Sequence, residues 1–313
     1  MSVPSGSRPT RSGGGLPTGL PAERQPATGV RDPGASEKLA RFRDAALAQG
    51  IPEGDVERWL GLARPSLVLS SDGEGPVVGH FGTPVTLPPD VTFPVYGDDP
   101  DVGHHEHLVA TLDLAALPEG ATNLSLPSDG HLLLFAWPAR EMSEYHGSSC
   151  AYAVYVPAGA EVGERVWHHD YEPDHELGDV DFDGELRGEI RLEYDVSLPD
   201  YENFEGDPLL KDHPHAGELG EVWSNIHSEG YWRKGPQLQL GGYALDAQGW
   251  GDPVAQCAFD DGGDAARRGD WTLLAQWHPG MYGLEGITVY WAIPEEDLVA
   301  HRFSPARGVM YAD

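Results

Sequence analysis

The chain has 313 residues, enough for one large domain or two ordinary ones, and 40% of them are hydrophobic, which supports a sizeable core. Fifty-one acidic against 20 basic residues give a formal net charge of −31, which would repel phosphate groups and so excludes nucleic acid and anionic membranes as partners. No apolar run approaches the roughly 20 residues that span a bilayer, and the opening MSVPSGSRPTRSGGG lacks a secretory segment, so we expect a cytoplasmic protein.

The first 35 residues are rich in Gly, Pro and Ser and show no apolar periodicity. They predict a disordered tail in front of a single domain over residues 36–313. Ser36 then resembles an N-cap, and apolar residues from Leu39 to Leu47 recur at helical spacing until Gly50. This pattern predicts a helix over residues 37–49.

A second helix is predicted directly afterwards. Pro52 suits a first helical turn, and Val56 and Trp59 share one face before Pro65 ends the pattern. The two helices together form a predicted N-terminal helical hairpin.

After Pro65 the chain consists of short apolar runs separated by Gly, Pro and Asp clusters. Examples are SLVLS, HLVATLDL, HLLLFAW, AYAVYVP and GITVYWAIP. Most connections are too short for helical crossovers, which favours antiparallel pairing. We therefore predict an α+β fold that is mainly antiparallel β-sheet, preceded by the helical hairpin.

Two stretches of this β region resemble each other. In each, a strand with a central alanine (Ala110 or Ala275) leads through a loop to a glycine (Gly130 or Gly286) that opens an aliphatic and aromatic strand. The similarity indicates two related β units with a cleft at their seam, unless it is a chance likeness between β segments. The units span about residues 66–157 and 236–304, and an acidic insertion covers about 161–215.

Histidines and acidic residues gather at two places that could hold a metal ion. In HHEH, residues 104–107, strand geometry puts only two potential ligands on each face, so a solvated strand entry is preferred. In residues 168–189, alternate aspartates before Gly184 match the first half of a calcium loop, but Ile190 stands where a glutamate should be. An acidic exposed hairpin is the preferred interpretation there. The candidate ligands for a divalent metal are His168, His169, Asp179, Asp181 and Asp183.

Other catalytic patterns are weak. Cys150 follows His146 by four residues, but a buried strand position is the preferred interpretation of this thiol. Cys150 and Cys257 lie far apart, so we expect neither a disulfide nor a zinc site. No GxSxG, HExxH, P-loop or GxGxxG motif occurs, so we assign no catalytic residue and expect no cofactor.

The stretch QLQLGGYALDAQGWGDPVAQ, residues 237–256, is the main candidate for binding. Its adjacent glycines permit positive φ and close approach of a ligand, its aromatic side chains offer flat surface, and glutamines both donate and accept hydrogen bonds. The alternative is that the glutamines satisfy buried backbone groups where the two units meet. The candidate ligand-binding residues are Gly241, Gly242, Tyr243, Gln248, Trp250 and Gln276.

The same stretch carries a family resemblance. LGGYALDAQGWGDP, with WTLLAQW, GITVYWAI, EEDLVAHRFS and an earlier Phe81-Gly82 entry, resembles the YwqG-like family of bacterial proteins of unknown function. The likeness covers roughly residues 37–313 and departs from the family pattern where Thr83, Thr111, Ala244 and Leu284 stand. It implies an α+β fold dominated by antiparallel sheet, and no established activity.

A non-catalytic binding module at the seam between the two units agrees best with these features. Its partner is expected to be a protein with a basic face, or a polar ligand, because complementary charge promotes encounter. One alternative is a metal-dependent hydrolase that uses residues 168–183. Another is an immunity-type protein that binds a cationic toxin, by analogy with proteins found beside such toxins.

Overall fold

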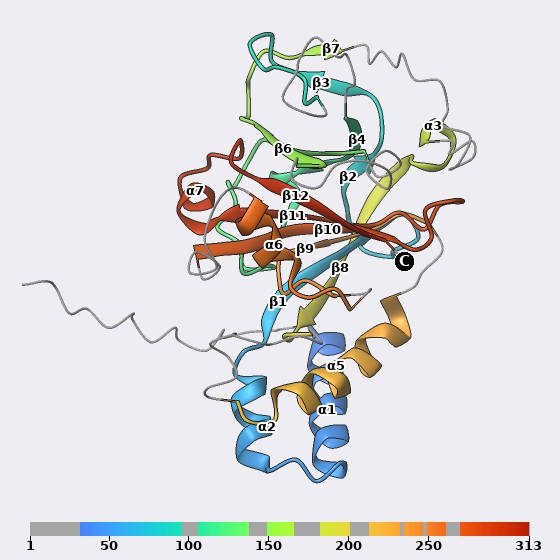
Figure 1. Cartoon of the computed structure of the whole chain (residues 1–313). Helices are drawn as coiled ribbons and strands as arrows, with labels where there is room; N and C mark the ends of the chain where they lie inside the picture. Colours follow the sequence, from blue (N-terminus) through green and yellow to red (C-terminus); the bar gives the residue numbers. More distant parts are fainter. Residues whose placement is uncertain are drawn as a thin grey trace, which may run out of the picture.

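The computed structural model describes residues 32–95, 106–137, 149–165, 182–200, 213–231, 235–246, 249–260 and 270–312. Within them the protein is an α+β fold dominated by a large antiparallel sheet, with a group of helices at one end (Figure 1). This confirms the predicted mainly antiparallel fold class.

The helical end is built from α1 (Pro33–Ala48), α2 (Glu53–Leu60) and α5 (Ala216–Tyr231). The predicted hairpin is confirmed, but α1 begins at Pro33 instead of 37. Asp32, and not Ser36, is its N-cap: the Asp32 carboxylate accepts the backbone N–H groups of Gly34 and Ala35. Helix α5, which the sequence analysis did not predict, packs against both α1 and α2.

Ten strands form the main sheet within the described residues, in the order β12-β11-β10-β9-β1-β8-β2-β4-β5-β6, and every pairing is antiparallel. Two short strands, β3 (Val85–Leu87) and β7 (Gly163–Arg165), pair separately. The ten strands are β1 (Arg64–Ser70), β2 (Val77–Phe81), β4 (His107–Asp113), β5 (His131–Ala136), β6 (Ala151–Val156), β8 (Gly188–Ser197), β9 (Gln237–Leu240), β10 (Trp271–His278), β11 (Ile287–Pro294) and β12 (Arg307–Ala312).

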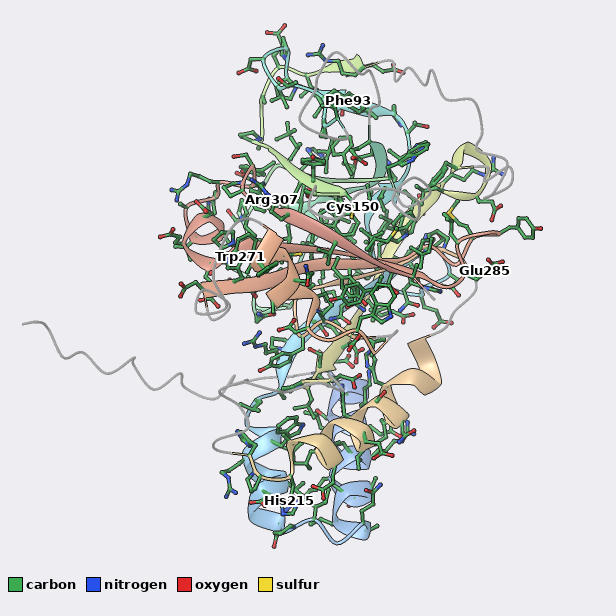
Figure 2. All side chains as sticks on the ribbon, in the orientation of Figure 1. Phe93, Cys150, His215, Trp271, Glu285 and Arg307 are labelled. Carbon is green, nitrogen blue, oxygen red and sulfur yellow. The ribbon has the colours of Figure 1, made fainter. Side chains whose placement is uncertain are left out.

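The sheet curls until its two edge strands, β6 and β12, meet. The backbone N–H of Cys150 donates to the carbonyl of Gly308 at 3.3 Å, and the Gly308 N–H donates to Ser149 Oγ at 2.9 Å. Inside the curl, Trp291 Nε1 donates to the carbonyls of Phe135 and Tyr152. Figure 2 labels Cys150 and Arg307 near this junction.

The largest hydrophobic core fills the inside of the curled sheet and contains Leu67, Leu238, Leu274, Trp277 and Trp291. On the outside, α6 (Pro253–Asp260) covers β10, β11 and β12. A separate cluster joins the three helices to the end of β8. Short helices α3 (Phe182–Glu185), η2 (Leu114–Ala116) and α7 (Glu295–Val299) complete the described elements.

Among the described residues, no helix is long and apolar enough to cross a membrane.

Candidate binding site

The double glycine forms a tight turn at the end of β9. Gly241 has φ 72° and Gly242 has φ 78°, a left-handed conformation that residues with a Cβ rarely adopt. The Gly242 N–H donates to Asn123 Oδ1 at 2.6 Å, and the Tyr243 N–H donates to Ser197 Oγ at 2.7 Å. The turn therefore joins β9 to the end of β8 and to the loop between β4 and β5.

Glutamine side chains hold this turn from beneath. Gln239 Nε2 donates to the carbonyls of Gly241 and Tyr243 at 2.9 and 2.8 Å. Gln276, opposite Gln239 on β10, accepts the N–H of Leu245 at 2.9 Å. Both side chains are buried, so in this structure they satisfy backbone groups.

Tyr243 connects the turn to the helical end. Its hydroxyl donates to the carbonyl of Leu62 at 3.2 Å, and the Arg64 guanidinium lies 4.0 Å from the centre of its ring. Tyr243 is only partly buried, but these contacts already occupy its hydroxyl and one ring face.

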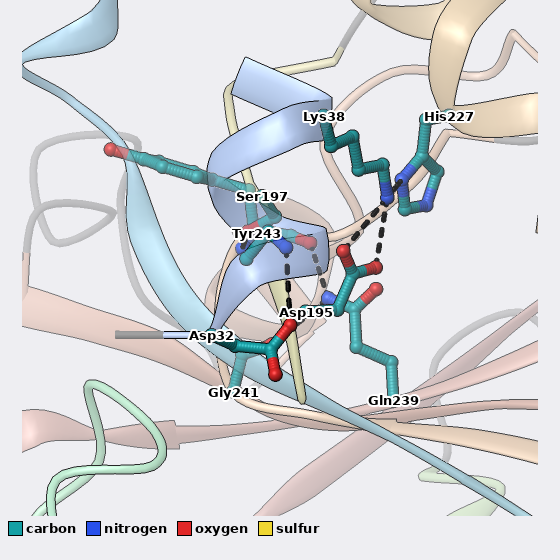
Figure 3. A network of polar contacts seen from close by, with 9 residues as sticks. Asp32, Lys38, Asp195, Ser197, His227, Gln239, Gly241 and Tyr243 are labelled. Carbon is teal, nitrogen blue, oxygen red and sulfur yellow. Dashed lines mark hydrogen bonds and ion pairs between the residues drawn. The ribbon is translucent and has the colours of Figure 1, made fainter. Parts of the chain in front are cut away.

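A partly buried polar network lies next to this turn, between α1, α5 and β8 (Figure 3). Lys38 Nζ is 2.9 Å from both oxygens of Asp195 and 2.8 Å from His227 Nδ1. Because an ammonium group only donates, His227 Nδ1 accepts and its ring proton is on Nε2. Burial, and secondly the charge of Lys38, lower the pKa of His227 to about 4, although Asp195 acts in the opposite direction.

Trp250 has a different environment from the rest of the predicted set. The Asp246 carboxylate accepts the N–H groups of Trp250 at 2.9 Å and Gly251 at 2.7 Å, which fixes the turn. Trp250 is 66% exposed, and its ring centre lies 5.6 Å from that of Tyr311 on β12.

A second exposed aromatic side chain comes from α6. Asp252 accepts the N–H of Val254 and so supports the start of this helix, and Phe259 near its end is 65% exposed. Trp250 contacts the outer cluster that α6 and β12 share, and Phe259 is an exposed residue of α6. This cluster consists of Ala244, Val254, Cys257, Ala258, Trp271, Leu273, Tyr290, Ala292, Val309 and Tyr311.

The structure thus separates the predicted ligand set. Gly241, Gly242, Tyr243 and Gln276 build the turn, while Trp250 projects from another turn. Gln248 lies outside the described residues.

The predicted metal ligands cannot be placed. His168, His169, Asp179 and Asp181 lie outside the described residues, and Asp183 is in α3 with its side chain undescribed. In the part of the chain that the structure describes, no three His, Cys, Asp or Glu side chains are grouped to hold a metal ion.

The described residues of the remaining sequence motifs lie in the protein interior. His107 stacks on both Trp137 and Phe182, with ring centres 4.2 and 4.1 Å away, and these two rings lie 5.6 Å from each other. Its motif partner Glu106 is fully buried, and His104 and His105 lie outside the described residues. Cys150 and Cys257 are buried, and neither forms a disulfide within the described residues; His146 lies outside these residues.

Sequence reasoning missed several residues that position the site. Asn123 and Ser197 hold the double glycine, Asp246 holds the Trp250 turn, and Lys38 and His227 connect the helices. Only Asp246 gave a local signal, since aspartate side chains commonly accept backbone N–H groups within a turn.

These features define an α+β protein with a curled antiparallel sheet, a helical end that the double-glycine turn contacts through Tyr243, and an exposed tryptophan next to an edge strand. The chain belongs to the family described as a domain of unknown function (DUF1963), whose sequence profile matches residues 80–310. The match runs from β2 into β12, so α1, α2 and the central strand β1 precede it. No curated protein matches the chain.

Proposed function

We propose that this protein is a non-catalytic binding module that recognises a basic protein partner through the Trp250 patch, which consists of the exposed Trp250 side chain and the Tyr311 ring next to it. The observation that carries the proposal is the presentation of Trp250: the residue is mostly exposed, although Asp246 fixes the turn by accepting the N–H groups of Trp250 and Gly251. A fixed turn loses little conformational freedom on binding, which favours affinity.

The chemistry of the patch agrees with a cationic partner. Tryptophan is the side chain most enriched at binding hot spots and the best partner for a cation over an aromatic face. The net charge of −31 attracts a basic protein at long range and repels an acidic one. A cationic toxin domain, the partner of an immunity-type protein, has this chemistry.

We also propose that the sheet consists of two related units and that the chain is a YwqG-like member of its family. In support, the second unit supplies the strands β9-β10-β11-β12 at one end of the sheet and the first unit supplies β2-β4-β5-β6 at the other, with β1 of the first unit and β8 of the acidic insertion between them. The pairings β4–β5 and β10–β11 each shift in register immediately before the central alanine of the two similar stretches, Ala110 or Ala275.

On this proposal, the units have two seams. The double-glycine turn lies at one, where the N–H groups of Gly242 and Tyr243, which follow β9, donate to Asn123 and to Ser197 of β8. The Trp250 patch adjoins the other, where β12 approaches β6. The expected binding surface is therefore the seam at the sheet edges and not the filled seam beneath the glycines.

The experiment is a calorimetric titration of the full chain with arginine- and lysine-rich peptides chosen from an immobilised array. We expect Trp250→Ala to weaken binding at least about tenfold, the effect of losing one hot-spot residue. Tyr282→Ala is the matched control, because Tyr282 is also an exposed aromatic residue but lies on the turn before β11.

The salt dependence gives an independent check. Affinity should fall steeply as ionic strength rises from about 0.05 to 0.3 M, because screening shortens the range of the charge attraction. Equal affinity of the native protein and Trp250→Ala, or binding that does not respond to salt, would refute the proposal.

A further inference from the structure

We propose that the basic partner docks as an added β-strand along the outer edge of β12, beyond Gly308. The inference rests on the proposed function and specifies how the partner is held: an extended segment pairs its backbone with β12, while its side chains reach the Trp250 patch. Addition of a strand to a sheet edge is a general mode of peptide recognition in which backbone hydrogen bonds supply affinity.

The direction of the backbone groups of β12 follows from Gly308. Both its N–H, which donates to Ser149, and its carbonyl, which accepts from Cys150, point away from β11. Backbone groups alternate in direction along a strand. The N–H and C=O of Met310 and Ala312 therefore also point away from β11, while those of Val309 and Tyr311 pair with it.

The outer side of β12 is an edge over this length. In the sheet formed by the described residues, β12 pairs with β11 alone, in register from Ala312 opposite Ile287 to Arg307 opposite Ala292. Its bonds to the other edge of the sheet are made at Gly308. Met310 and Ala312 are partly exposed, as expected for residues of an edge strand. A strand whose outward backbone groups have no hydrogen-bond partner among the described residues is a template for another strand.

The position of the aromatic side chains points to the same edge. Tyr311 belongs to the outer cluster on one face of β12, and Trp250 contacts it from that face. Neighbouring strands lie about 4.8 Å apart, so alternate side chains of an added strand would come within reach of Tyr311 and Trp250. The backbone ladder and the Trp250 patch thus form one continuous surface.

The net charge of the protein indicates which kind of partner binds at the β12 edge. A second copy of this chain could also pair its β12 with this edge, but two molecules of net charge −31 repel each other. A basic segment is attracted instead, and cationic side chains next to Trp250 can lie over the indole face. We therefore assign the edge to an extended basic segment of another protein.

The test compares Met310→Pro with Met310→Leu in the full chain. Proline lacks an N–H, but the Met310 N–H points away from β11, so the substitution removes no ladder bond within the sheet and is compatible with an edge strand. Leucine preserves the N–H and fills the same apolar site against the main core. With the peptide selected above, Met310→Pro should lose at least about tenfold in affinity, and Met310→Leu should bind like the native protein.

A measurement on the native protein keeps the test decisive if Met310→Pro does not fold. Hydrogen exchange of the Met310 and Ala312 amides should slow when the protein is saturated with the peptide, because both N–H groups become bonded. Unchanged exchange at both amides would overturn strand addition.

The outcomes separate this inference from the proposed function. If Trp250→Ala weakens binding while Met310→Pro and the exchange rates show no effect, the patch binds but strand addition is wrong. If neither variant weakens binding, the proposed function fails as well. Concentration-dependent dimerisation that Met310→Pro abolishes would assign the edge to a second copy and overturn the basic partner.

Discussion

Gly242 requires glycine for two independent reasons. Its φ of 78° lies in the left-handed region, and a Cβ built on it would overlap Ser197 Oγ and lie 3.0 Å from Ser66 Cβ. The first reason concerns the backbone alone and the second concerns the packing of three strands at the seam.

We expect Gly242→Ala to lower the free energy of unfolding by about 2 to 4 kcal/mol, of which roughly 1 kcal/mol is the left-handed backbone and the remainder is the overlap. Gly159→Ala is the control, since Gly159 has φ 76° but no atom within 4 Å of its added Cβ. Urea denaturation of both variants measures the difference. Equal losses would contradict a tightly packed seam at Gly242.

At this scale, the sequence predicted the conformation of the turn but not its partners. Adjacent glycines indicate positive φ wherever they occur. Asn123 and Ser197, however, are 119 and 46 residues away from the amides that they accept, and no local pattern relates them. The alternative role for Gln276, satisfaction of a backbone group, was also a sequence prediction, and its bond to Leu245 agrees with it.

At the scale of elements, the network of Lys38, Asp195 and His227 attaches α1 and α5 to β8. The imidazole is buried, faces the Lys38 ammonium and stacks on Trp223 at 5.7 Å, with Asp195 on the far side of the ammonium. A second positive charge here would lack water and would lie next to the first. This is why the folded protein holds His227 neutral.

The stability of the protein should therefore fall in acid. The pKa of His227 is about 4 in the folded chain and 6.5 in the unfolded chain, so below pH 6.5 the unfolded state binds the extra proton. The contribution is complete above pH 6.5 and is lost as the pH falls towards 4, by up to about 3 kcal/mol.

The measurement is the free energy of unfolding from pH 7.5 to 4 for the native chain and for His227→Asn, which retains an acceptor for Lys38 but does not titrate. Other titrating groups are common to both proteins and cancel in the difference. The native protein should lose stability faster over this range. Parallel curves would show that His227 is not held neutral by the fold.

The elements that the sequence analysis missed carried usable signals. In α5, Leu219, Val222, Trp223 and Ile226 recur at helical spacing and all pack in the helical cluster, but the glycines of this segment lower its helix propensity. In β8, Ile190, Leu192 and Val196 alternate with charged residues as in a half-buried strand. The acidic composition concealed that pattern, so residues 161–215 were interpreted as an insertion although they supply a central strand.

At the scale of the whole molecule, strand order could not be derived from the sequence. β1 directly precedes β2 in the chain, yet the neighbours of β1 in the sheet are β8 and β9. Local patterns indicate which segments are strands, but pairing across more than 100 residues depends on long-range packing that a single sequence does not display. The same holds for the approach of β6 to β12, which determines whether the outer edge is available to a partner.

The junction of β6 and β12 gives the last prediction. Gly308 has no left-handed backbone, but a Cβ on it would overlap Ala151 Cβ and lie 2.9 Å from Ala151 N and Cα. Gly308→Ala should therefore destabilise the protein by about 1 to 3 kcal/mol, purely through overpacking. Because the nearest obstacle is the Ala151 methyl group, Ala151→Gly in the same chain should restore part of the loss, while the backbone contacts retain the rest. A double-mutant cycle measured by urea denaturation isolates this coupling, and additive losses would mean that the two strands do not touch at Gly308.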